Sequence, residues 1–156
     1  MQYLSEDSAI LLQSLLALVL GGLIGWEREA SQKWAGLRTH MLVCLASFLF
    51  VKIAYLMVEM MLAREGVPAE VVQSDPIRII EAVVTGLAFL GAGTIFRDHS
   101  ENRARGLTTA ASLLAVAPIG IAVALERYVL AIGVALLVVF VLRTLGVLEA
   151  KILSKK

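Results

Sequence analysis

The stretch LTTAASLLAVAPIGIAVALERYVLAIGVALLVVFVLRTLGVL, residues 107–148, decides the fold class. It holds two apolar runs, Leu107–Leu125 and Tyr128–Leu148, separated only by Glu126 and Arg127. A bilayer core of about 30 Å is crossed by roughly 20 apolar residues in a helix. The runs lack the alternation of strands, which favours helices. Their two-residue link therefore predicts a pair of antiparallel transmembrane helices.

Three further apolar runs precede this pair, at Ser8–Trp26, Thr39–Met61 and Ile77–Phe96. Hydrophobic residues make up 59% of the chain and charged residues 17%, whereas a soluble domain has about 45–50% and about 25%. Because lipid admits only helices or closed barrels, we predict one all-α membrane domain over residues 1–156 with five transmembrane helices. The alternative is four spans and one re-entrant segment, for which the run containing Pro118 is the best candidate.

The 14 Lys and Arg residues are unevenly divided between the two sides of such a bundle. Lys52 lies within a span, and Arg64, Arg78 and Arg127 fall on one side. By the positive-inside rule, the richer side is cytoplasmic, so we expect the N-terminus outside and the C-terminus inside. The richer side carries ten residues: Arg28, Lys33, Arg38, Arg97, Arg103, Arg105, Arg143, Lys151, Lys155 and Lys156.

An offset of 70 residues aligns Leu20-Gly21 with Leu90-Gly91, and residues 36–39 with 106–109. This indicates a two-helix hairpin used twice as a parallel repeat, related by an axis along the membrane normal. Chance agreement in an apolar chain is the alternative. Small residues let transmembrane helices approach closely, and we assign a helix-packing role to Gly21, Gly25, Ala82, Gly86, Gly91 and Gly93.

Charged residues and helix starts gather at the predicted cytoplasmic side. Thr39 and Thr109 are suitable helix caps, and helix N-termini beside arginines suit an anion. Three interpretations remain open: a closed network of internal ion pairs, a ligand or ion site, and a surface that docks a partner. The cluster comprises Glu27, Arg28, Glu29, Arg38, Thr39, Arg97, Asp98, Arg105, Thr108 and Thr109.

Two ionisable residues, Lys52 and Glu81, lie inside predicted spans, in the outer half of the membrane. Ionisable groups at such depth are costly and often functional. We expect them to pair and to line a vestibule; the alternative is that Lys52 snorkels to the headgroups and Glu81 marks the interface. His40 has no partner at metal-ligand spacing and is interpreted as interfacial, so the sequence leaves any metal site unknown.

Four motifs occur in order: GGLIGWERE (21–29), AGLRTHMLVCL (35–45), VVTGLAFLGAGTIFR (83–97) and RGLTTAAS (105–112). On these motifs the chain resembles the MgtC/SapB family of bacterial inner-membrane proteins. The resemblance implies a five-helix, multi-pass protein linked to growth at low magnesium. Longer members carry a C-terminal domain of the ACT type, and we expect a short form without it. Some members have Asn in place of Thr108, so a role specific to that amide is not carried over.

The resemblance implies a function in magnesium homeostasis or low-magnesium adaptation, through transport of Mg²⁺ or another small ion. The alternative is a non-transporting regulator that binds other membrane proteins such as the ATP synthase. We expect no enzyme activity, because no phosphate-binding loop, dinucleotide fingerprint or nucleophile motif occurs. No cofactor is expected, with Mg²⁺ as substrate or ligand. The expected partners are the lipid bilayer, a second copy in a homodimer and other membrane proteins, but no nucleic acid.

Overall fold

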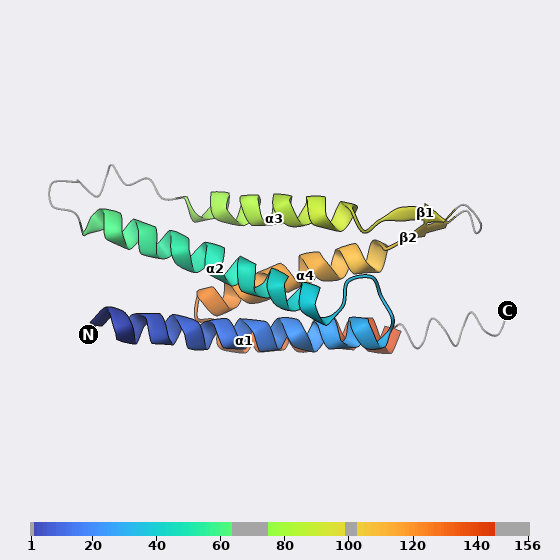
Figure 1. Cartoon of the computed structure of the whole chain (residues 1–156), viewed down its shortest axis with the longest axis horizontal. Coiled ribbons are helices and arrows are strands. Elements are labelled where there is room, and N and C mark those ends of the chain that lie inside the picture. Colours follow the sequence, from blue (N-terminus) through green and yellow to red (C-terminus); the bar gives the residue numbers. More distant parts are fainter. Residues whose placement is uncertain (1, 64–74, 99–102, 146–156) are drawn as a thin grey trace.

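The computed structural model describes residues 2–63, 75–98 and 103–145, which form an elongated helical bundle (Figure 1). A small antiparallel hairpin interrupts the helices, with Phe96 opposite Arg105. The elements in chain order are α1 (Gln2–Ala30), α2 (Leu37–Leu62), α3 (Pro76–Ala92), β1 (Phe96–Asp98), β2 (Arg103–Arg105), α4 (Leu107–Ala124), α5 (Tyr128–Phe140) and a π-helical turn, η2 (Val141–Leu145).

The prediction of five helices is confirmed, but only four of the described ones are long and apolar enough to cross a membrane. They are Leu4–Ala30, Leu37–Leu62, Leu107–Ala124 and Tyr128–Leu145. Helix α3 has 17 residues, or about 26 Å at 1.5 Å per residue. It ends at Ala92 and not at the predicted Phe96, because the chain turns at Gly93 and enters the hairpin. Helix α4 continues through Pro118 as one helix, so that run is not the re-entrant one.

Helix α4 is the centre of the bundle and packs against α1, α2, α3 and α5. Most of its residues from Thr109 to Ala124 are buried. Helix α1 contributes a narrower stripe, Ala17, Leu20 and Ile24, spaced by three and four residues as in an amphipathic helix. The core is therefore made mainly by α1, α2 and α4, α5 adds the buried Ala131 and Ala135, and α3 packs outside.

Glycines set the distances between these three helices. A Cβ atom on Gly21 would lie 2.6 Å from the His40 carbonyl oxygen, and one on Gly25 would lie 2.7 Å from the Leu37 Cα. Gly120 of α4 leaves no room for a Cβ against the Cys44 carbonyl of α2. Side chains at these positions would push the helices apart.

One end of the bundle collects the end of α1, the start of α2, the hairpin and the start of α4 (Figure 1). Gly36 and Gly106, which the 70-residue offset pairs, are both N-cap residues. Gly106 has φ +91°, a left-handed conformation that favours glycine. The repeat itself, and the orientation of the termini across the membrane, stay predictions.

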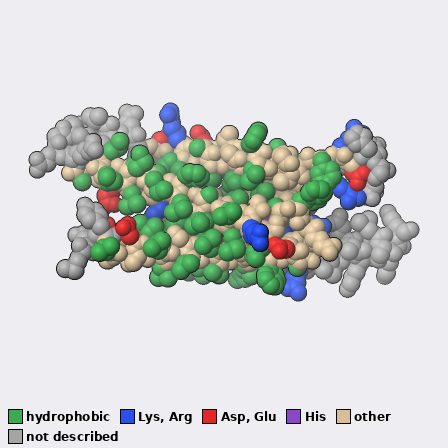
Figure 2. Space-filling view, in the orientation of Figure 1, with side chains coloured by type: hydrophobic (Ala, Val, Ile, Leu, Met, Phe, Trp, Pro, Cys, Tyr) green, Lys and Arg blue, Asp and Glu red, His purple; other side chains and the backbone are tan. Residues whose placement is uncertain are grey.

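The outer surface carries large apolar side chains along the bundle (Figure 2). Leu11, Phe89 and Val129 are 66%, 86% and 88% exposed, a surface that water would disfavour and lipid accepts. Trp26 and Trp34 are also largely exposed, as residues of an aromatic belt at a membrane interface are. The protein is therefore a membrane protein.

Replacing Gly120 with alanine is expected to lower the free energy of unfolding by about 1–3 kcal/mol, because the added methyl group forces α2 and α4 apart. Gly133 of α5 is the matched control, since a Cβ there meets nothing within 4 Å. Its alanine variant is expected to change stability by less than about 0.5 kcal/mol. Unfolding of both variants in mixed micelles, followed by circular dichroism, measures the difference; equal values would contradict the assigned contact.

Candidate functional site

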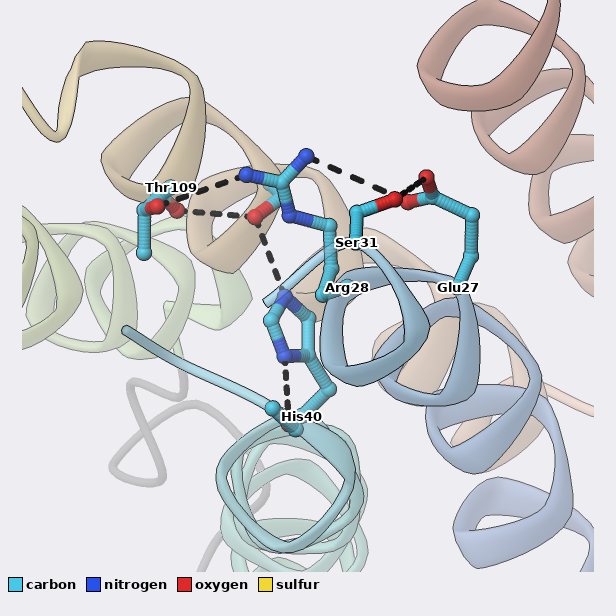
Figure 3. A network of polar contacts seen from close by, with 7 residues as sticks. Glu27, Arg28, Ser31, His40 and Thr109 are labelled. Atoms are coloured by element: carbon cyan, nitrogen blue, oxygen red, sulfur yellow. Dashed lines mark hydrogen bonds and ion pairs between the residues drawn. The ribbon is translucent and has the colours of Figure 1, made fainter. Parts of the chain in front are cut away.

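A buried arginine lies where α1 ends beside the start of α4 (Figure 3). The Arg28 side chain is 3% exposed, and its Nη2 donates to Thr109 Oγ1 at 3.4 Å. Its Nη1 lies 3.9 Å from Glu27 Oε2, and Ser31 Oγ donates to the other oxygen of Glu27 at 2.9 Å. Both contacts of Arg28 are long, and its Nε has no hydrogen-bond partner among the described residues.

His40 continues this network from α2 to α4. The His40 side chain is fully buried, with Nδ1 2.9 Å from the Gly36 carbonyl and Nε2 3.0 Å from Ser112 Oγ. Ser112 Oγ is also 2.8 Å from the Thr109 carbonyl. The interpretation of His40 as interfacial concerns its depth and stays a prediction, but the face of α2 on which it lies turns its side chain into the core of the bundle. We call Glu27, Arg28, Ser31, His40, Thr109 and Ser112 the polar network.

The hydrogen bonds that run from Gly36 through His40 and Ser112 to Thr109 need more protons than a neutral histidine and a serine supply. Both ends are carbonyl oxygens, which only accept, and three contacts join them through His40 and Ser112. A neutral imidazole and a hydroxyl supply one proton each. Hence a neutral His40 makes two of the three contacts in either tautomer. Either Nδ1–H donates to Gly36 and the Ser112 hydroxyl donates to Nε2 or to the Thr109 carbonyl, or Nε2–H donates to Ser112 and the Ser112 hydroxyl donates to the Thr109 carbonyl. An imidazolium would satisfy all three contacts at once.

Glu29 closes the turn between α1 and α2. Its Oε2 accepts the backbone N–H of Leu37, the first residue of α2, at 2.8 Å. A carboxylate at this position satisfies a free donor and complements the positive end of the helix dipole. The predicted caps Thr39 and Thr109 are wrong, because α2 and α4 begin two residues earlier, and their N-cap residues are Gly36 and Gly106, which make no side-chain capping hydrogen bond.

The hairpin holds a separate ion pair. Arg105 Nε lies 2.9 Å from Asp98 Oδ2 across the two strands. The Trp34 ring packs edge-on against Phe96, with ring centroids 5.0 Å apart, and so joins the α1–α2 turn to the hairpin. The predicted charged cluster is therefore divided into the polar network, the Glu29 cap and the hairpin, which also carries Arg97 on β1. Arg38 and Thr108 are exposed.

Lys52 pairs with Glu126 and not with Glu81. Lys52 Nζ lies 3.4 Å from Glu126 Oε1, and Gln13 Nε2 reaches the same oxygen at 3.3 Å and Tyr128 Oη at 2.9 Å. Glu81 is exposed on α3. The predicted pair is wrong because the face of α2 that carries Lys52 turns toward the α4–α5 link, where Glu126 lies.

Sequence reasoning assigned no role in a site to Gln13, Ser112 or Glu126. Ser112 follows Thr109 by three residues on an otherwise apolar helix, which places both on one face. That spacing was visible in the sequence, but it does not tell which helix they meet. Glu126 was read only as part of a tight link, although a carboxylate at a helix end facing a lysine in a span is a natural partner.

The small residues that were assigned a helix-packing role form two groups. Gly21 and Gly25 lie against α2, and a Cβ on Gly91 would lie 3.4 Å from the Cβ of Ala110. Ala82 and Gly86 instead face open space on α3, where a Cβ on Gly86 meets nothing within 4 Å. Within the described ranges, no group of three or more His, Cys, Asp or Glu residues converges as a metal site would require.

The chain matches the MgtC family over residues 15–151. It belongs to this family. The chain is 34% identical over 145 residues to "Putative magnesium transporter YhiD" of Escherichia coli K12, covering 93% of this chain and 64% of the relative. It is 39% identical over 105 residues to "Protein MgtC" of Brucella suis, covering 67% and 38%, and 36% identical over 118 residues to "Protein MgtC" of Salmonella typhimurium, covering 76% and 44%.

The chain thus spans less than two thirds of the length of these MgtC-family relatives. No solved structure matches it. All four motifs of the family resemblance lie within the matched region, and three of them supply every residue of the polar network except Ser31.

Replacing Arg28 with glutamine is expected to lower the free energy of unfolding by about 1–3 kcal/mol, because it leaves the buried contacts of Thr109 and Glu27 unmade. Arg143 is the matched control, since its side chain is exposed on η2 and its glutamine variant should change stability by less than about 0.5 kcal/mol. Denaturation in micelles tests both; an unchanged Arg28→Gln variant would mean that the network adds nothing to stability.

Proposed function

We propose that this MgtC-family protein acts in magnesium homeostasis as a non-conducting membrane protein that binds and regulates another membrane protein. The observation that carries the proposal is the sealed layer between the polar network and the Lys52–Glu126 pair. The magnesium part rests on the family membership and on the name of the Escherichia coli relative.

The sealed layer consists of interdigitated apolar side chains from α1, α2 and α4. Its buried apolar residues are Leu20, Cys44, Phe48, Leu113 and Val116. Helix α2 also contributes one buried polar side chain to this layer, Ser47. Glycine contacts close the spaces between the helices. A hydrated divalent ion would have to lose its water in this layer without ligands that replace it, and Mg²⁺ gives up its water reluctantly.

Each end of this layer carries both a positive and a negative side chain. Arg28 and Lys52 are each held by a carboxylate, Glu27 and Glu126 respectively. Each carboxylate that could attract a cation is therefore already paired with a positive side chain. This arrangement supports a structural bundle that presents its outer surface to a partner more than it supports a cation path through one chain.

The regulatory proposal takes the ATP synthase as its partner, since the family resemblance implies it. We expect ATP-driven proton pumping to fall when the bacterial ATP synthase and this chain are placed in the same proteoliposomes. An unrelated membrane protein at the same density is the control, and a pH-sensitive dye gives the readout. Pumping that equals the control would contradict this choice of partner.

The magnesium part is tested in cells that lack the gene. They are expected to grow more slowly than the parent at limiting Mg²⁺ and equally at high Mg²⁺, and the full chain supplied from a plasmid should restore growth. A growth defect that persists unchanged at high Mg²⁺ would point away from magnesium homeostasis.

Magnesium transport is the second candidate, and the name of the Escherichia coli relative favours it. In proteoliposomes that contain only this chain and a Mg²⁺-sensitive dye, the sealed layer predicts no flux above protein-free vesicles. Saturable flux that Glu81→Gln or Lys52→Met abolishes would overturn the non-conducting proposal and place that residue on the path. Circular dichroism confirms that each variant is folded.

A further inference from the structure

A groove of about 580 Å³ lies between α2 and α3. Its volume is in the range of about 300–1,000 Å³ that is typical of sites for small molecules. Its lining is apolar over most of its length, with Leu42, Ala46 and Phe50 on α2 and Ala82, Gly86 and Leu90 on α3.

The groove exists because small residues stand where a tightly packed helix pair would have larger ones. A Cβ atom on Gly86 meets nothing within 4 Å, and Ala82, one turn earlier, is exposed. Larger side chains rise on both sides, since Leu42, Phe50 and Leu90 are 63%, 59% and 45% exposed. The result is an apolar groove along the bundle that is open to the surroundings of α2 and α3.

One end of the groove is polar and positively charged. Arg38 and Thr39, the second and third residues of α2, line it there. The Arg38 side chain is exposed, and none of the ion pairs between described residues involves it. Glu29, whose carboxylate binds the Leu37 N–H nearby, does not line the groove.

The polar end lies at the depth of lipid headgroups. Trp34, four residues before Arg38, is 78% exposed, and Trp26 of α1 is 69% exposed. Exposed tryptophans of membrane proteins lie at the interface between lipid and water. From Arg38 to Phe50, α2 then runs about 18 Å into the bilayer at 1.5 Å per residue.

We propose that this groove binds one anionic phospholipid, with its phosphate on Arg38 and Thr39 and an acyl chain along α2 and α3. A phosphate oxygen accepts charge-assisted hydrogen bonds from a guanidinium and a hydrogen bond from a hydroxyl. The apolar walls take the acyl chain. The groove therefore matches a ligand that is charged at one end and apolar over the rest.

A second copy of the chain fits the same groove less well. A symmetric dimer pairs the same surface of both copies, with its axis along the membrane normal. Both Arg38 side chains would then lie at one depth in one interface, and no carboxylate among the lining residues would neutralise them. Like charges in such a contact disfavour it, whereas a lipid phosphate neutralises the arginine.

The lipid site is independent of the proposed regulatory function. Its test is native mass spectrometry of the full chain in detergent, with phosphatidylglycerol or phosphatidylcholine added. We expect the wild-type protein to prefer phosphatidylglycerol. Arg38→Gln should weaken phosphatidylglycerol binding about fivefold, the loss of one basic residue at an anionic lipid surface, and abolish the preference over phosphatidylcholine.

Two variants separate the groove from general effects of charge. Lys33→Gln removes a positive charge from the same end, outside the groove, and should bind both lipids as the wild type does. Gly86→Leu puts a side chain into open space in the groove and should lower the binding of both lipids. Far-ultraviolet circular dichroism checks that each variant is folded.

Several results would overturn the proposal. Equal losses in Arg38→Gln and Lys33→Gln would mean that charge acts without a site, and full lipid binding by Gly86→Leu would mean that the acyl chain lies elsewhere. Competition by glycerol phosphate as strong as that by the lipid would make this a simple anion site. A disulfide between two Gly86→Cys chains in membranes would assign the groove to a second copy.

Discussion

Lipid gives helices no hydrophobic reason to associate, so this bundle depends on how closely the backbones of α1, α2 and α4 approach one another. That approach is set where side chains are missing. Gly21 and Gly25 let α2 approach α1 closely, and Gly120 lets α4 approach α2 closely. Dispersion attraction falls steeply with distance, so a shift of a few tenths of an ångström at these contacts weakens the whole interface. The central position of α4 and the sealed layer follow from these close glycine contacts.

The polar network fixes how the helices are rotated against one another, which close glycine packing alone would leave less specific. His40 and Ser112 fix the rotation of α2 against α4, and Arg28 fixes α1 against the same turn of α4. Hydrogen bonds in an apolar medium demand defined partners, because an unpaired polar group there is costly. The family motifs are therefore seen to meet in space: the residues after the first apolar run contact those that open the second and the fourth.

The sequence was sufficient for the fold class, because apolar length and a two-residue link restrict the chain to helices in a bilayer. It was insufficient where the answer depends on contacts across the bundle. Lys52 was placed at the correct depth but given the wrong partner, since depth does not tell which neighbour a helix face meets. The hairpin at Phe96–Arg105 was missed because three-residue strands have no measurable period, and the apolar run continues through Phe96. The burial of His40 against α4 was missed for the same reason as the partner of Lys52.

The contact between Arg28 and Thr109 joins positions 81 residues apart, and this has a consequence for biogenesis. As the chain leaves the ribosome, α1 and α2 emerge before α4 is made. During that interval α4 does not cover the guanidinium, Glu27 and His40, so this end stays in contact with water or the insertion machinery. Arrival of α4 then removes them from water together. The final architecture is thus completed by a late-synthesised helix, and truncated chains that end before residue 107 leave their costliest groups uncovered.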